Sequence, residues 1–202
     1  MDHHRADSAV SRNVLLTGLT SFFTDVSSEL VYPLLQAFVS LILVARQTLL
    51  GPFLGLIEGL AESTASLLKV FSGYYSDRSD RRKPLTVGGY AASALAKLLL
   101  LLASRSWAFV LLSRFADRVG KGVRSAPRDA LIAESVPARV QGRAFGLQRG
   151  MDFAGATVGA LLAFFLARRF LDPITGNLAG VDSFLRIFLI SLVPAFLGVV
   201  FL

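Results

Sequence analysis

The chain has 202 residues, 53% of them hydrophobic, and a formal net charge of +7 at pH 7. This composition is too apolar for an ordinary soluble domain and predicts a polytopic membrane protein. Because the chain has no cysteine, a disulfide framework and a thiolate metal site are excluded. The positive charge lies in short loops and at helix ends, so no separate basic domain is present to bind nucleic acid.

Six apolar runs predict six transmembrane helices, since about 20 apolar residues are enough to cross a bilayer. The predicted spans cover residues 13–44, 49–76, 84–103, 107–133, 143–167 and 184–202. Residues 1–12 form a polar tail, and the apolar run after them is much longer than the core of a signal peptide. We therefore expect an all-α integral membrane protein that keeps its first helix.

The first span carries charged and hydroxyl side chains near its middle. Asp25 and Glu29 are four residues apart and share one helix face. Two carboxylates facing lipid would be costly, so this face is expected to line a wet cavity or to meet cations. Pro33 removes a backbone hydrogen bond beside them and is expected to bend the helix.

The second span repeats this arrangement. Glu58 and Glu62 share one face, alongside small residues that include Gly55 and Gly59. Small residues four apart allow another helix to approach closely. We interpret this helix as a packing surface with a second pair of acids on it or beside it.

Residues 73–83 are predicted to form a short loop between the second and third spans. Four cations fall within six residues, which favours the cytoplasmic side of the membrane. The order of the residues resembles the signature loop between the second and third helices of the major facilitator superfamily of transporters. The matching residues are Gly73, Asp77, Arg78, Arg81 and Arg82, whereas Tyr75 and Asp80 depart from the pattern. The resemblance implies that this is a gating loop and that the N-terminus is cytoplasmic, in the cell (inner) membrane.

The third span has Lys97 as its one charge and is interpreted as scaffold. The fourth span is the most charged, and Arg114, Arg118 and Lys121 lie on one stripe of it. Its apolar beginning, 107–113, favours a crossing helix over one that lies on the membrane surface. The segment from Arg114 to Gly122 resembles the superfamily's fourth-helix motif, which implies a role for Arg114 in proton coupling.

The fifth span is rich in glycine and predicts a second close-packing helix. Its packing glycines are Gly146, Gly150, Gly155 and Gly159, after Gly142 at the start. Ala156 stands where the superfamily's antiporter motif has proline, so antiport is not inferred. A cytoplasmic loop at 134–142 precedes this span, and an outer loop at 168–183 leads to an apolar sixth span.

The resemblance covers essentially the whole chain but accounts for one six-helix half, residues 13–202. In the superfamily two parallel halves enclose the solute, which leaves two alternatives open. Two copies of this chain could pair as a parallel homodimer of twelve helices, with Asp77 at the start of the partner copy's fifth helix, near 143–146. Alternatively, the chain is a truncated or split half that does not transport without a different partner half.

The resemblance implies a secondary transporter that moves a small solute by alternating access and is linked to protons. The first and fourth helices would line the cavity, bringing Asp25 and Glu29 towards Arg114, Arg118 and Lys121. The cations favour an organic anion, whereas the carboxylates, with Glu58 and Glu62, would suit a cation or a proton relay. No nucleotide-binding loop, nucleophile motif or histidine within a span is present, so we expect neither an enzyme nor a cofactor.

Overall fold

The fold is known from a computed structural model that describes residues 11–42, 47–79, 81–170 and 180–202. Helices account for almost all of these residues, and no strand occurs in those ranges. The elements are α1 (Arg12–Ile42), α2 (Gln47–Ser79), α3 (Arg82–Leu98) with the 3-10 segment η2 (Leu99–Leu102), α4 (Ala108–Glu134), η3 (Ala138–Val140), α5 (Gln141–Phe170) and α6 (Gly180–Val200). The six-helix prediction is thus confirmed.

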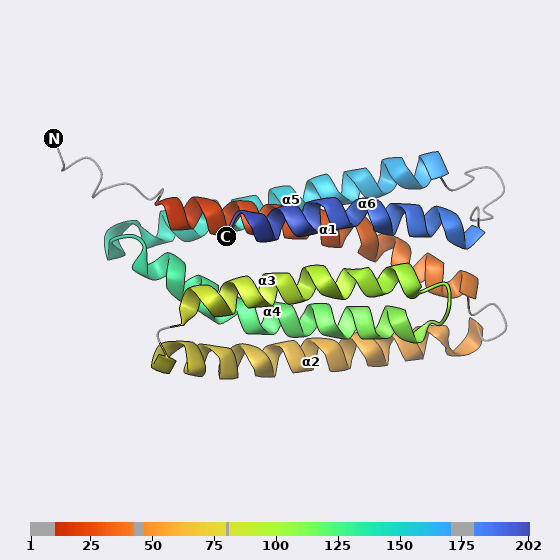
Figure 1. Cartoon of the computed structure of the whole chain (residues 1–202), viewed down its shortest axis with the longest axis horizontal. Coiled ribbons are helices and arrows are strands. Elements are labelled where there is room, and N and C mark those ends of the chain that lie inside the picture. The colour runs from red at the N-terminus through yellow and green to blue at the C-terminus, as the bar shows by residue number, and fades with distance from the viewer. Residues whose placement is uncertain (1–10, 43–46, 80, 171–179) are drawn as a thin grey trace.

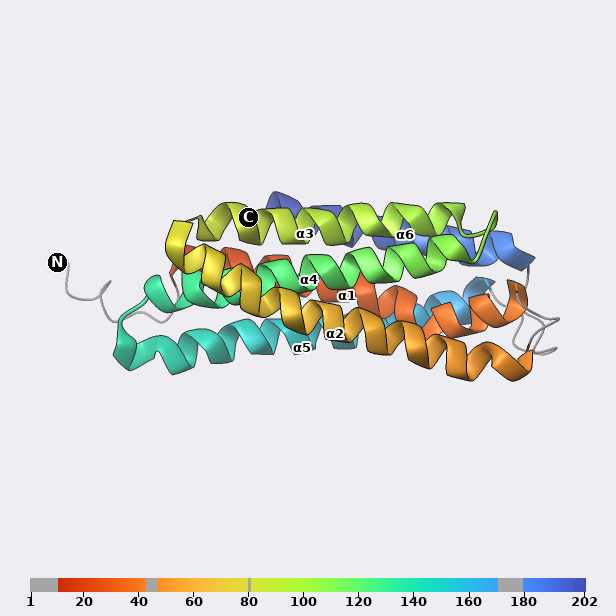
Figure 2. The ribbon, with the colours of Figure 1, turned by 90° about the horizontal axis from the view of Figure 1, so that it is seen from below.

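The helices form two groups of three (Figure 1). In one group α1 packs against α5 and α6, and in the other α4 packs against α2 and α3. Seen from below, α2 and α5 lie on one side of the bundle and α3 and α6 on the other, with α1 and α4 between them (Figure 2). The most charged helix, α4, is therefore one of the two central ones.

Successive helices run in opposite directions, as membrane crossings require (Figure 1). The start of α1, the α2–α3 connection and the α4–α5 connection lie at the same end of the bundle, and the end of α6 points to it. By length and composition alone, three of the described segments could cross a bilayer: Arg82–Leu102, Ala138–Phe170 and Gly180–Val200. The remaining helices, α1, α2 and α4, carry most of the acids and bases discussed below.

The predicted loops are too long at the end that carries the α2–α3 turn. Residues 73–79 belong to the last turns of α2, and α3 begins at Arg82, so most of the predicted loop 73–83 is helical. The helix continues because no residue between Gly73 and Ser79 interrupts it. Arg78 in its last turn also stabilises it, since a cation there interacts favourably with the negative end of the helix dipole. The predicted loop 134–142 similarly contains η3 and the start of α5.

At the opposite end, the predicted outer loop 168–183 is too long on both sides. Helix α5 extends to Phe170 and α6 begins at Gly180. Residues 171–179 lie outside the described ranges. Pro33 lies inside α1, which continues through it.

Two apolar clusters hold the ends of the bundle together. Phe38 of α1 packs against Phe184 and Phe188 of α6, with ring centroids 5.3 and 5.2 Å away. Near the other end, Val14 of α1 packs in a cluster with Ile132 of α4. Between these two levels α1 buries hydroxyl side chains instead, so the middle of the bundle is polar.

The glycines of α5 divide into two kinds. A Cβ on Gly159 would lie 2.5 Å from the carbonyl oxygen of Val26, and one on Gly155 would strike the backbone of Phe22. These two glycines allow α1 and α5 to touch backbone to backbone. By contrast, a Cβ on any of the other four predicted packing glycines would meet nothing within 4 Å among the described residues. Those four are Gly55, Gly59, Gly146 and Gly150, and their predicted packing against a second half lies outside the contacts of a single chain.

Candidate functional site

The polar middle of the bundle is built on the buried hydroxyls of α1. Ser21 shares a 2.6 Å hydrogen bond with the Tyr90 hydroxyl of α3, and Ser27 donates to the carbonyl of Ser191 on α6 at 2.7 Å. Small hydroxyl side chains at helical spacing let three helices meet here, and the Ser21 and Ser27 hydroxyls find hydrogen-bond partners on the neighbouring helices. The result is a hydrogen-bonded seam that joins the two groups of helices.

Lys97, the one charge of the predicted third span, is part of this seam. Its side chain is 2% exposed, and the ammonium donates to Ser27 at 2.8 Å and to Ser28 at 3.1 Å. Among the described residues it has no carboxylate within ion-pair distance, although it interacts electrostatically with Asp117. A single lysine in the middle of an apolar span was the signal in the sequence, because such a residue must find polar partners.

Asp117 of α4 was also missed. It is 5% exposed and accepts a hydrogen bond from the Tyr32 hydroxyl of α1, while its Oδ1 has no hydrogen-bond partner among the described residues. The Arg114 guanidinium lies over the Tyr32 ring, 3.6 Å from the centroid. Tyr32 therefore contacts a buried carboxylate with its hydroxyl and an arginine with the face of its ring.

Helices α2 and α4 are joined by a ladder of opposite charges. Arg114 pairs with Glu58 through two nitrogens, one of them at 2.9 Å, and Arg118 lies 3.3 Å from Glu62. Both acids and both bases are four residues apart, so the spacings match along adjacent helices. The prediction that Arg114 and Arg118 approach the acids of α1 is therefore wrong, because both arginines pair with the acids of α2.

Lys121 does meet Asp25 and Glu29, in a cavity of about 350 Å³. The cavity is lined by residues of α1 to α5. It has more charged side chains than the acids of α1 and the one stripe of α4 that the sequence predicted. It includes Arg124 and Arg128, one turn apart on α4, which sequence reasoning had not singled out. Both are more than nine-tenths buried. The available signal was a second pair of arginines four residues apart, following the pair Arg114 and Arg118.

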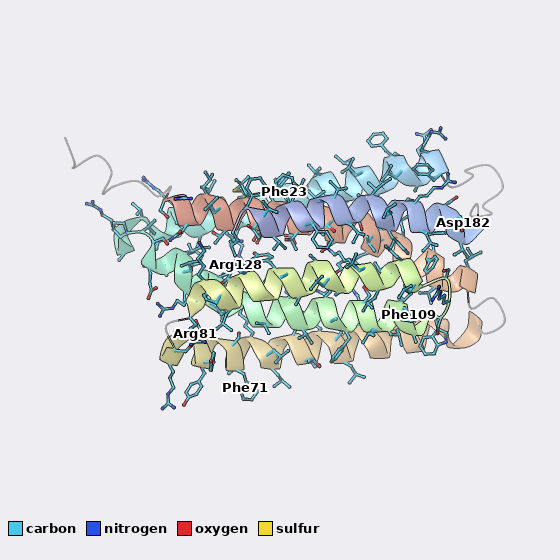
Figure 3. The ribbon with its side chains drawn as sticks, in the orientation of Figure 1. Phe23, Phe71, Arg81, Phe109, Arg128 and Asp182 are labelled. Carbon is cyan, nitrogen blue, oxygen red and sulfur yellow. The ribbon has the colours of Figure 1, made fainter. Side chains whose placement is uncertain are left out.

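The two buried arginines have different partners. Arg128 bonds the carboxylate of Asp129 at 2.8 and 3.0 Å and reaches Ser21 of α1 at 3.4 Å. It lies where the two groups of helices meet (Figure 3). Arg124 instead stacks over the Tyr90 ring at 4.4 Å and donates to the hydroxyl of Ser93. One arginine is neutralised and the other is held only by neutral groups.

Helix α5 completes the cavity. The fully buried Gln148 donates to Ser21 at 3.2 Å and to Asp152 at 2.9 Å, and Arg149 lies 3.5 Å from Asp152. Within the described ranges no group of three or more histidine, cysteine or acidic side chains could hold a metal ion.

The residues of the predicted gating loop lie at one end of the bundle, away from the cavity. Arg82 contacts Asp77 at 3.5 Å and also Glu134 of α4, so it ties the end of α2 to the end of α4. Arg78 lies over the Tyr74 ring at 4.9 Å. Arg81 is exposed at this end (Figure 3). The predicted contact of Asp77 with a partner copy is outside the contacts of a single chain.

The arrangement of six helices and the charged turn can be compared with known proteins. The sequence pattern of the family described as Major Facilitator Superfamily matches residues 17–202. The chain belongs to the Major Facilitator Superfamily. The superfamily assignment made from the 73–83 motif is thereby confirmed, and the bundle is one six-helix half of the superfamily fold.

Relatives of this superfamily chain include an uncharacterized MFS-type transporter of Methanocaldococcus jannaschii, 41% identical over 78% of this chain and 38% of the relative. An uncharacterized protein of Mycobacterium tuberculosis is 34% identical over 63% of this chain and 30% of its own length. A multidrug resistance protein, MdtG, of Citrobacter koseri is 30% identical over 79% of this chain and 38% of its own length. The chain thus spans well under half of each of these relatives.

Proposed function

We propose that this superfamily chain is one half of a proton-linked secondary transporter, and that the cavity between α1, α4 and α5 lies on the path of a small solute. The observation that carries the proposal is the cavity's charge. Asp25, Glu29 and Lys121 line it and have no ion-pair partner within 4.0 Å among the described residues. Charges placed in this way inside a membrane protein are stable only where water or a solute reaches them.

The proton-linked part of the proposal rests on the two carboxylates of α1. Asp25 and Glu29 are half-buried and free of ion pairs in the described chain, so either can take up a proton without breaking a salt bridge. Arg114, for which the resemblance implies a role in proton coupling, would contribute by a different route. Its charge is bound to Glu58, so protonation of Glu58 would release it.

The second half of the path has two candidate sources. One is a second copy of this chain in parallel, and the other is a six-helix unit of different sequence. The relatives support the second source, because the matched part of the Methanocaldococcus jannaschii protein is 38% of its length and leaves room for another bundle. Native mass spectrometry of the chain in nanodiscs distinguishes them. A stable species of two copies supports the homodimer, and a single copy supports a different partner half.

Because the chain has no cysteine, single-cysteine labelling tests the path directly. Ala156 lines the cavity from α5, whereas Ala154, two positions earlier on the opposite face, is exposed and does not line it. We expect membrane-impermeant thiol reagents to label Ala156→Cys faster than Ala154→Cys in the assembled transporter in membranes. Labelling of Ala156→Cys from both sides of the membrane would indicate alternating access. Equal, slow labelling of both variants would overturn the proposal of a wet path.

The proposed orientation places the N-terminus and the α2–α3 turn in the cytoplasm of a cell whose inner membrane holds the chain. This end of the bundle carries Arg81 and, in the first turn of α3, Arg82 and Lys83, and clustered cations of this kind are retained on the cytoplasmic side. A cysteine at exposed Lys83 should react with an impermeant maleimide only after the cells are permeabilised. Reaction in intact cells would place this end outside and reverse the topology.

A further inference from the structure

The geometry points to an oxyanion site in this cavity. We propose that the solute carries a carboxylate or phosphate group, which binds between Arg124 and Lys121 of α4. The inference rests on the proposed function, since it names the chemistry of the solute that the cavity accepts. It assigns a role to Arg124, a residue outside the superfamily motifs considered above.

Arg124 is preorganised to hold an anion. Its side chain is 6% exposed and its guanidinium stacks on the Tyr90 ring at 4.4 Å, while one terminal nitrogen donates to Ser93. Stacking and one hydrogen bond fix the plane of the guanidinium, and the donors not used by Ser93 remain available. A guanidinium held in this way presents parallel N–H groups, which match the two oxygens of a carboxylate or phosphate.

The other arginines of α4 in this region already have acidic partners. Arg114 has Glu58, Arg118 has Glu62, and Arg128 has Asp129. Within the described part of the chain, Arg124 has no carboxylate within 4.0 Å. Asp25 and Asp117 act on Arg124 only at longer range. A buried cation with no carboxylate in direct contact is costly, and an anionic ligand lowers that cost. The pairing of its neighbours therefore makes Arg124 the position where an anion is stabilised most.

The charge balance of the cavity supports the same sign. Among the described residues that line it, five side chains are cationic and three are carboxylates. Arg128 and Arg149 have acidic partners, which leaves Lys69, Lys121 and Arg124 against Asp25 and Glu29. Protonation of either acid increases the positive excess, so binding of an anion and uptake of a proton favour each other.

The first test measures the sign of the cavity potential without knowing the solute. Purified Ala156→Cys in detergent is treated with an anionic sulfonate and with a cationic ammonium methanethiosulfonate of similar size. The ratio of the two rates is divided by the ratio for a free thiol in solution. We expect this normalised ratio to favour the anionic reagent by about tenfold, since surplus charge in a cleft raises the local concentration of the opposite ion. A ratio at or below one would overturn the oxyanion site.

Variants of the cations locate the effect. Arg124→Gln and Lys121→Gln should each lower the normalised ratio severalfold, and Arg124→Lys should keep most of it because the charge remains. Lys121 makes no ion pair in the described chain, so Lys121→Gln tests the idea even if Arg124→Gln does not fold. Arg81→Gln removes the same charge at the exposed end of the bundle and should leave the ratio unchanged. An unchanged ratio in both Arg124→Gln and Lys121→Gln, or an equal loss in Arg81→Gln, would contradict the assignment.

Protection of the cysteine identifies the group that binds. Inorganic phosphate, succinate and choline are added separately to Ala156→Cys, each at the same ionic strength, and labelling by a neutral maleimide is followed. Protection by phosphate or by succinate, lost in Arg124→Gln, supports the site and says which oxyanion it prefers. Protection by choline alone, or by none of the three, overturns it. Because this assay uses detergent and no membrane, its failure leaves the two-sided labelling of Ala156→Cys, and hence the transporter proposal, intact.

Discussion

Gly159 of α5 offers a sharp test of how α1 and α5 pack. A Cβ at this position would lie 2.5 Å from the Val26 carbonyl oxygen and 2.9 Å from the Cβ of Glu29. An ordinary contact begins near 3.4 Å, so Gly159→Ala must separate the helices locally by about 0.9 Å. The obstacle is backbone, which cannot rotate away. Overpacking of this kind costs about 1–3 kcal/mol.

Gly150→Ala is the matched control, because a Cβ on Gly150 meets nothing within 4 Å. Both substitutions gain about 1 kcal/mol of helix propensity on the same helix, so the difference between them isolates the overpacking. For a difference of about 2 kcal/mol in the free energy of unfolding, Gly159→Ala should melt roughly 4–8 °C below Gly150→Ala. The measurement is thermal unfolding of the purified chain in detergent. Equal melting temperatures would show that α1 and α5 do not approach as closely as described.

Three further predictions concern the buried and terminal charges. Tyr32→Phe should lower the free energy of unfolding by about 1–3 kcal/mol, because the Asp117 carboxylate loses the hydroxyl that donates to it and its other oxygen already lacks a partner. An unchanged midpoint of urea unfolding would argue against this hydrogen bond. Lys97→Met should lower the free energy of unfolding by about 3 kcal/mol, because the Asp117 carboxylate loses a nearby positive charge. Adding Asp117→Asn should recover part of that loss in a double-mutant cycle, whereas strictly additive losses would exclude the coupling. Arg82→Gln should speed amide hydrogen exchange in the last turn of α2 severalfold, whereas Arg81→Gln should not, because only Arg82 contacts acids of α2 and α4.

Close packing in this bundle could be predicted only in part. The glycine ladder of α5 was visible in the sequence, and Gly155 and Gly159 do contact α1. The same pattern equally marked Gly146 and Gly150, where a Cβ would meet nothing within 4 Å in the part of the chain that the structure describes. Spacing shows which residues share a face of a helix, but which part of that face touches a neighbour depends on where the two helix axes cross.

The sequence by itself determined the number of spans, the alternating topology, the charged turn and the superfamily. Each of these depends on local properties: the length of an apolar run, the charge of a short connection and the order of residues within it. It also indicated that Asp25, Glu29 and Lys121 belong to one polar region, and these three do line one cavity. Their function as a site stays a prediction.

Only the tertiary structure decided which charge meets which. Arg114 and Lys121 were predicted to act together from one stripe of α4, yet Arg114 turns to Glu58 of α2 while Lys121 faces the acids of α1. A charged helix at the centre of a bundle has neighbours on several sides, and a difference of a few tens of degrees around its axis selects another partner. That rotation is set by packing between helices distant in the sequence, such as α1 against α5, and no local pattern contains it.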